Sequence, residues 1–258
     1  MIGKLLKWLR GEREATPLPN ALWQETIAGL PFLARLSATE QARMRDLTEA
    51  FLAEKEFTSA GGLELTDAMC ISIAAQGCLL ILNLGLDYYR GWVGIIVYPD
   101  EFVIPRRIED EFGVVHEYDD VASGEAWQGG PLLVSWRDAQ MAGGGYNVVI
   151  HEFAHKLDMR NGAADGIPPL PAGMSRVAWE ATLFAAYDDF CERVDAAEER
   201  GEDTLLDPYA AENPGEFFAV MSEAFFETPK ILREEYPALY ELLTGVYAQD
   251  PGARPLAS

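Results

Sequence analysis

The sequence is short of basic residues, histidines and cysteines, and it contains no long apolar run. Its 258 residues include 20 Lys and Arg against 42 Asp and Glu, so the formal net charge is −22. Such an acidic chain repels phosphate backbones, and we therefore expect no direct binding to nucleic acid. The charge would attract cations or a basic protein, although a solubilising charge on exposed helix faces is the commoner reason for it.

The cysteines are too few and too scattered for a disulfide framework: they are Cys70, Cys78 and Cys191. Free thiols fit a reducing compartment, and we expect the protein to be cytoplasmic. No stretch approaches the roughly 20 apolar residues of a membrane span, so we predict none. The basic start, Met1–Arg10, lacks the apolar core of a signal peptide. We expect it to pack onto the domain; a short amphipathic helix that touches a membrane is the alternative.

Hydrophobic residues, which can build a core, make up 49% of the sequence, and charged residues make up 24%. These values are ordinary for a globular protein. The length suits one large domain, or a catalytic domain with a smaller appendage.

Local patterns predict an α+β fold. Ser37–Glu40 is a capping box that opens a helix, and a second helix runs from Thr66 toward Leu80. Short β-rich runs follow, and four helices are then expected after Gly143–Gly145. The strands are predicted at Gly91–Tyr98, Phe102–Ile104 and Pro131–Trp136, and the later helices at Tyr146–Met159, Val177–Arg200, Asn213–Phe226 and Leu232–Tyr247. We divide the chain into a helical N-terminal region, 1–80, and a catalytic region, 81–258, which together form one compact unit.

The helix predicted at Tyr146–Met159 carries the pattern H-E-x-x-H. His151 and His155 are four residues apart, so they project from one helix face and can share a metal ion. Glu152 adjoins them and is placed to take a proton from an attacking water. Two ordinary helical histidines are the alternative, but the chain has only 3 histidines and two stand at ligand spacing. Lys156 departs from the usual uncharged residue, and we expect its side chain to turn outward to solvent.

A catalytic zinc site needs a third protein ligand, and Glu216 is the best candidate. It stands three residues after Asn213, where a glutamate commonly completes a capping box instead. Glu212 and Glu223 are rival ligands on the same segment.

The sequence His-Glu-Phe-Ala-His-Lys-Leu-Asp, paired with Tyr-x(6)-Glu-Phe-Phe-Ala, resembles the Mlc titration factor A family of zinc peptidases. That family is similar to the catalytic domain of anthrax lethal factor. The likeness covers most of the chain and extends to Gly124–Trp127 and Ser135–Trp136. It implies a zincin-like fold with a small mixed sheet, an active-site helix and one zinc ion per chain. It also implies that His151, His155 and Glu216 bind the zinc ion and that Glu152 is the general base. In the same family pattern, Tyr209 donates a hydrogen bond to the oxyanion.

Roles around this centre are predicted less directly. Asp158, two turns after His151, could accept a hydrogen bond from a ligand imidazole, or be a loop residue at the helix end. Lethal factor has an acid four residues after its glutamate ligand where this chain has Val220, so Glu223 is the substitute. His116 is either a surface histidine or a fourth ligand that holds the enzyme inhibited until a loop moves.

Substrate selection rests on thinner signals. We expect Pro131–Trp136 to be the edge strand along which an extended peptide lies. Glu125, in the loop before it, either binds a substrate α-ammonium, which would favour aminopeptidase action, or is a solvated acid. Three functions follow: a peptidase, a regulator that sequesters the Mlc repressor and so modulates glucose phosphotransferase uptake, or a catalytically silent protein with a structural zinc. The presence of Glu152 argues against the last, because a closed structural site does not need it.

Overall fold

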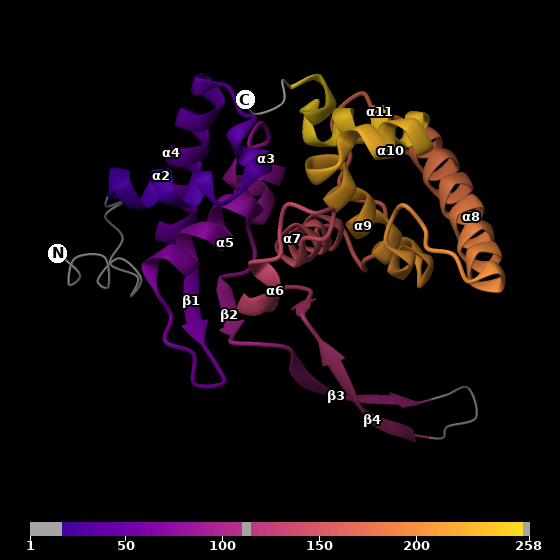
Figure 1. The fold of residues 1–258 in the computed structure, drawn as a ribbon, viewed down its shortest axis with the longest axis horizontal. Coiled ribbons are helices and arrows are strands. Elements are labelled where there is room, and N and C mark those ends of the chain that lie inside the picture. The colour runs from indigo at the N-terminus through magenta and orange to yellow at the C-terminus, as the bar shows by residue number, and fades with distance from the viewer. Residues whose placement is uncertain (1–16, 110–114, 255–258) are drawn as a thin grey trace.

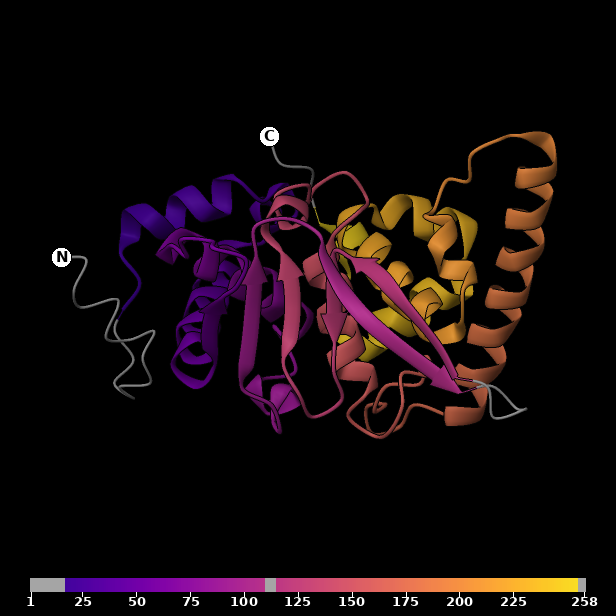
Figure 2. The same ribbon diagram turned by 90° about the horizontal axis from the view of Figure 1, so that it is seen from below.

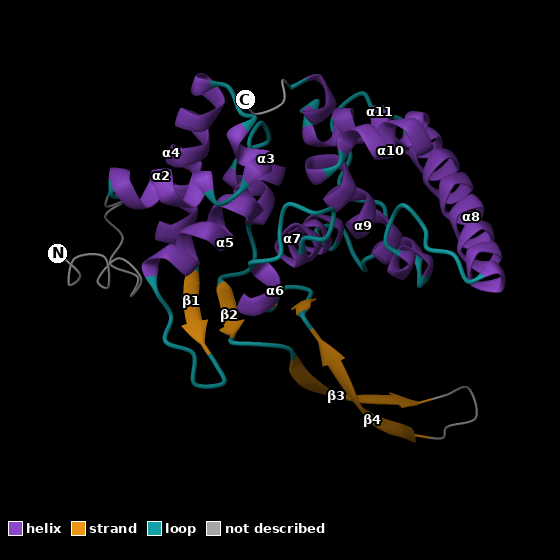
Figure 3. Ribbon diagram, in the orientation of Figure 1, coloured by secondary structure: helices purple, strands orange, loops and turns teal. Residues whose placement is uncertain are grey.

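The computed structural model of the chain describes residues 17–109 and 115–254. The segment Met1–Arg10, expected to pack as an amphipathic stretch, lies outside the described residues. Figure 3 shows the helices gathered on one side of the molecule and the strands on the other, which confirms the predicted α+β class. In the described part of the chain no helix has both the length and the apolar character needed to cross a bilayer.

The main sheet has the strand order β1-β2-β6-β5. Strands β1 (Glu56–Ser59), β2 (Gly94–Tyr98) and β6 (Leu132–Ser135) are parallel, and β5 (Gly124–Ala126) runs antiparallel to β6. The prediction that Pro131–Trp136 forms the edge strand is therefore wrong, because β5 pairs with β6 and takes the edge. Figure 2 shows the strands side by side between the N-terminal helices, in indigo, and the C-terminal helices, in orange and yellow.

A separate antiparallel hairpin leaves the body of the molecule. Its strands are β3 (Phe102–Glu109) and β4 (Val115–Ala122), and Figure 1 shows it projecting away from the helices. The sequence predicts only the start of β3. At the base of the hairpin Phe102 and Ile104 are buried against Leu133 of β6, which fixes the hairpin to the sheet.

The helices follow the predicted order with one break. Tyr236 adopts a non-helical backbone before Pro237, because a proline disfavours helical geometry in the residue before it and has no amide to donate. The single helix predicted at Leu232–Tyr247 is thus two. The helices are α2 (Asn20–Ala28), α3 (Pro31–Ala34), α4 (Ala38–Glu54), α5 (Asp67–Leu80), α6 (Trp136–Ala139), α7 (Val148–Asp158), α8 (Arg176–Arg200), α9 (Pro214–Glu227), α10 (Pro229–Glu235) and α11 (Pro237–Tyr247), with 3-10 turns η1 (Leu86–Tyr89), η2 (Pro208–Ala211) and η3 (Pro251–Ala253).

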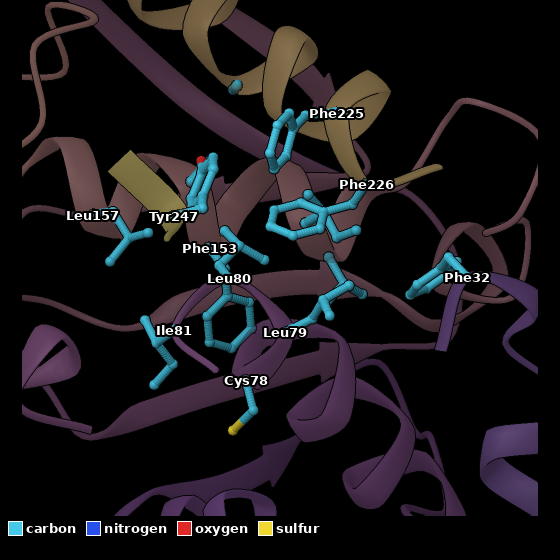
Figure 4. Close-up of a cluster of buried hydrophobic side chains, with 14 of the residues drawn as sticks. Phe32, Cys78, Leu79, Leu80, Ile81, Phe153, Leu157, Phe225, Phe226 and Tyr247 are labelled. Carbon is cyan, nitrogen blue, oxygen red and sulfur yellow. The ribbon is translucent and has the colours of Figure 1, made fainter. Parts of the chain in front are cut away.

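Helix α7 lies at the centre of the hydrophobic core. Figure 4 shows its Phe153 and Leu157 among buried side chains of α5, α9 and α11. Gly77 of α5 makes this approach possible, since a Cβ on it would lie 2.5 Å from the Phe153 ring. The core joins side chains from both predicted regions, and the division at residue 80 stays a prediction.

Candidate metal centre

Helix α7 begins where Asn147 caps it. The Asn147 side chain accepts a hydrogen bond from the amide of Ile150 at 2.9 Å, which satisfies one of the free amides of the first turn. The apolar residues of α7 face the core, so the opposite face, with His151 and His155, is turned toward the neighbouring helix α9.

Helix α9 brings a carboxylate to both histidines. Oε2 of Glu216 lies 2.9 Å from Nε2 of His151 and 3.2 Å from Nε2 of His155, and the two Nε2 atoms are 3.1 Å apart. The three side chains form a group able to hold a metal ion. Asn213 caps α9 through the amides of Gly215 and Glu216, but the Glu216 carboxylate turns to the histidines rather than back to the cap.

The rival carboxylates take other places. Glu212 is exposed and lies outside the group. Glu223, two turns after Glu216, is buried, and its Oε1 lies 2.8 Å from Nδ1 of His151. A carboxylate at Nδ1 holds a proton on that nitrogen, which leaves Nε2 as the atom of His151 that would bind a metal ion. Two imidazole nitrogens and one carboxylate oxygen that converge in this way fit a divalent metal such as zinc.

The negative charge of Glu216 and a positive charge on His151 stabilise each other. Burial opposes ionisation of Glu216, but its hydrogen bonds to both histidines outweigh this and hold its pKa well below the usual range. Burial likewise lowers the pKa of His151, yet the carboxylates of Glu216 and Glu223 raise it well above its ordinary value. Burial raises the pKa of Glu223. The site is thus built to stabilise positive charge between α7 and α9.

Glu152 lies next to this group and faces the edge strand. It is 5% exposed, and its Oε2 has no hydrogen-bond partner among the described residues. Burial raises the pKa of Glu152 to about 7. Its carboxylate packs against β5, where a Cβ on Gly124 would lie 2.4 Å from Glu152 Oε1. Only a glycine leaves room for this carboxylate.

A pocket of about 330 Å³ opens over His151 and Glu152. Tyr209, in η2, borders it with 54% of its surface exposed, and its ring centroid is 6.1 Å from that of His151. Tyr146, which precedes the cap of α7, also lines the pocket; burial raises its pKa to about 12, and a hydrogen bond to Ser123 acts against this. Tyr146 belongs to no motif, and its only signal in the sequence is its place between a glycine run and the H-E-x-x-H helix.

Lys156 does not turn outward, so that prediction is wrong. It is 4% exposed, and its Nζ donates hydrogen bonds to the carbonyl oxygens of Trp127, Gly130 and Pro131 at 2.7, 2.8 and 3.1 Å. Burial lowers the pKa of Lys156 to about 8. The carbonyl oxygens of the β5–β6 turn take the place of water as hydrogen-bond acceptors for the ammonium group. These hydrogen bonds tie the edge strand to α7.

The roles of Asp158 beside a ligand imidazole and of Glu125 toward a substrate stay predictions. Asp158 Oδ2 accepts a hydrogen bond from the amide of Gly166 at 2.8 Å, whereas its Oδ1 and the Nδ1 of His155 have no partner in the described part of the chain. Glu125 belongs to strand β5 rather than to a loop, and its Oε1 lies 2.6 Å from Arg106 Nη1.

His116 lies in strand β4, with its backbone opposite Ile108 of β3. Its role as a fourth ligand stays a prediction.

A buried network around the start of α7 went unpredicted. Glu227 of α9 accepts hydrogen bonds from the amides of Gly143 and Gly145 at 2.8 and 2.7 Å, and from the Asn147 side chain at 2.8 Å. Glu223 accepts from the Asn147 amide. The glycine run before α7 is thereby fixed to the same helix that supplies Glu216.

Comparisons with known proteins agree on one relationship. A family model described as glucose-regulated metallo-peptidase M90 matches residues 5–248. The chain is 40% identical over 253 residues to the Mlc titration factor A of Salmonella arizonae, which covers 97% of this chain and 99% of that protein. It is 39% identical over 253 residues to the Mlc titration factor A of Salmonella typhi, covering 97% of this chain and 94% of that protein.

Proposed function

The chain belongs to the glucose-regulated metallo-peptidase M90 family, and from this premise we propose that it is a zinc-dependent peptidase with a zincin-like catalytic fold. The observation that carries the proposal is the convergence of His151, His155 and Glu216 beside the buried carboxylate of Glu152. The nitrogen and oxygen donors suit zinc and leave room for water. The three free cysteines support a reducing, cytoplasmic location.

In the proposed reaction each side chain has one task. Zinc, when bound by His151, His155 and Glu216, supplies a Lewis acid that polarises the scissile carbonyl and acidifies the attacking water. Glu152 accepts the proton of that water and passes it to the leaving amine. The Tyr209 hydroxyl donates a hydrogen bond to the developing oxyanion. Glu223 fixes the ring of His151 from the other side.

The edge strand suggests how a peptide is bound. We assign peptide docking to β5, because its outer edge has no partner strand in the described structure and it runs beside Glu152. Glu125 of β5 supports aminopeptidase action. Its Oε2 is buried and has no hydrogen-bond partner within residues 17–109 and 115–254, so it could take a substrate α-ammonium, while Arg106 holds Oε1.

Zinc content and hydrolysis, measured together on wild type and Glu152→Gln, test the proposal. Aminoacyl and dipeptidyl chromogenic substrates should be cleaved by the wild type and not by Glu152→Gln, with about one zinc per chain in both. Glu234→Gln, a change of the same kind at an exposed acid, is the control and should behave as wild type. Equal inactivity of all three with zinc bound would instead support a structural site.

A second function is favoured by the names of the relatives. Because the similar Salmonella proteins are called Mlc titration factor A, we propose that this chain also binds an Mlc-type repressor and so affects glucose uptake. Calorimetric titration of the chain with purified repressor tests this, and absence of binding in the presence and absence of zinc would remove the proposal.

The inhibitory role of His116 is tested in the same assay. His116→Ala should raise the rate of hydrolysis if His116 occupies the position needed by water, and the zinc content should not change. An unaltered rate would leave His116 outside the centre.

A further inference from the structure

A second pocket adjoins the one over Glu152. It measures about 570 Å³, and Tyr146, Asp207 and Val220 line both pockets. The shared side chains make the two spaces neighbours with a common wall, so a peptide held over Glu152 could place a side chain in the second pocket.

The second pocket has an apolar floor and an acidic rim. The floor comes from α8, α9, α10 and the segment before η2, and the rim from the end of α8 and the same segment. Among the described residues, no lysine, arginine or histidine lines it. The floor includes Val194, Ala197, Leu206, Val220, Ala224 and Ile231, and the rim Glu198, Glu202, Asp203 and Asp207.

Two of the rim carboxylates are already engaged. Glu202 pairs with Arg200 at 2.6 Å, and Asp207 accepts a hydrogen bond from the Tyr209 amide at 3.0 Å as the cap of η2. Glu198 and Asp203 form no ion pair with any residue in 17–109 or 115–254. These two remain available to a cation from outside the chain.

We propose that this pocket is a specificity subsite for a substrate residue with an aliphatic stem and a cationic end, a lysine or arginine next to the scissile bond. The inference rests on the proposed peptidase function and names its substrate class. The stem would cover the apolar floor while the charged end stays at the rim, in the way that long basic side chains usually lie on protein surfaces. Glu198 and Asp203 would set the preference for positive charge.

The expected preference is modest because the rim is exposed. Charge pairs at solvent-exposed positions contribute little, and two of them correspond to a preference of roughly tenfold in kcat/KM. A substrate with glutamate at the same position should be the poorest, since it meets like charge.

Quenched fluorescent peptides that differ at one residue beside the scissile bond test the subsite on the zinc-loaded full chain. Two series, one varied on each side of the bond, carry lysine, norleucine or glutamate. In one of the two series, kcat/KM for the lysine peptide should be about tenfold higher than for the norleucine peptide. The double variant Glu198→Gln, Asp203→Asn should abolish that preference while cleaving norleucine peptides as before.

The matched control is Asp195→Asn, Glu199→Gln. It removes the same charge from exposed positions of α8 that do not line the pocket, and it should keep the lysine preference. The subsite proposal would be overturned if both double variants lost the lysine preference equally, or if the wild type showed no lysine preference in either series.

If no peptide is cleaved, the peptidase proposal fails and the subsite is judged by binding. Fluorescence anisotropy with zinc-loaded Glu152→Gln should then show the lysine peptide binding about tenfold more tightly than norleucine. Equal affinity would overturn the subsite independently of catalysis.

Discussion

The two walls of the pocket over His151 and Glu152 are built in contrasting ways. The helical wall, α7 and α9, is buried and cross-linked by carboxylates on one face of α9: Glu216, Glu223 and Glu227. The strand wall consists of the three-residue edge strand β5 and a projecting hairpin, joined through the Arg106–Glu125 ion pair. The helical wall is fixed by hydrogen bonds between buried side chains of two helices. The strand wall is fixed by the pairing of β5 with β6, by the Arg106–Glu125 ion pair and by the hydrogen bonds of Lys156 to the β5–β6 turn.

The contrast separates two kinds of task. A metal centre needs donors held to within a fraction of an ångström, which a packed helix pair provides. A peptide-binding edge needs open backbone groups and tolerance of varied side chains, which a short edge strand provides. Substitutions in the helical wall should therefore remove the metal, whereas those in the strand wall should leave the metal and alter turnover.

The largest effect is expected at Glu216. Glu216→Gln removes the anionic donor between His151 and His155, so zinc affinity should fall by more than about 100-fold and hydrolysis with it. Competition with a chromogenic chelator measures the affinity. Retention of zinc at wild-type affinity would place the metal elsewhere.

Glu223→Gln should come next. The amide cannot hold the proton of His151 Nδ1 as a carboxylate does, and loss of such a partner typically costs about 10- to 100-fold in metal affinity. The chelator competition applies again, and added zinc should restore part of the activity. A variant with unchanged affinity and reduced activity would contradict the orienting role.

Gly124→Ala tests the strand wall. The new Cβ would displace Glu152, so kcat should fall by about 100-fold while zinc affinity stays near wild type. Gly94→Ala in β2 is the control, because its Cβ would meet Pro131 at an ordinary 3.4 Å. If Gly124→Ala lost zinc while the control Gly94→Ala kept it, the two walls would not be independent.

The smallest effect is expected from the two buried lysines whose ammonium groups lie near the Trp92 ring. Lys55 donates to the carbonyls of Tyr89 and Trp92, and Lys156 to the β5–β6 turn. Each change to methionine leaves buried carbonyls unpaired and should cost about 1–3 kcal/mol in unfolding free energy.

Only Lys156→Met should also raise KM, by a few-fold, because only Lys156 holds β5. Urea unfolding and steady-state kinetics on both variants, with zinc content checked, measure the two effects. An equal rise in KM for Lys55→Met would remove the positioning role of Lys156.

The sequence predicts the helical wall better than the strand wall, for a physical reason. A helix fixes the spacing of His151 and His155 locally, and the Asn213 cap locates Glu216. Strand order depends on partners distant in the chain, and three residues of β5 carry too little pattern to reveal an edge. The burial of Lys156 was equally hidden, since its partners are backbone carbonyls that any sequence offers.

The carboxylates on the inner face of α9 have a consequence for folding. Together with Glu152 they place several acidic groups in a small buried volume, and burial raises the pKa values of Glu223 and Glu227 because their negative charges are poorly solvated there. A divalent cation would relieve this repulsion, so ion uptake and the closing together of α7 and α9 are thermodynamically linked. A bound ion would then stabilise the folded protein in addition to its part in the proposed reaction. Chelation should therefore lower the melting temperature of the whole protein.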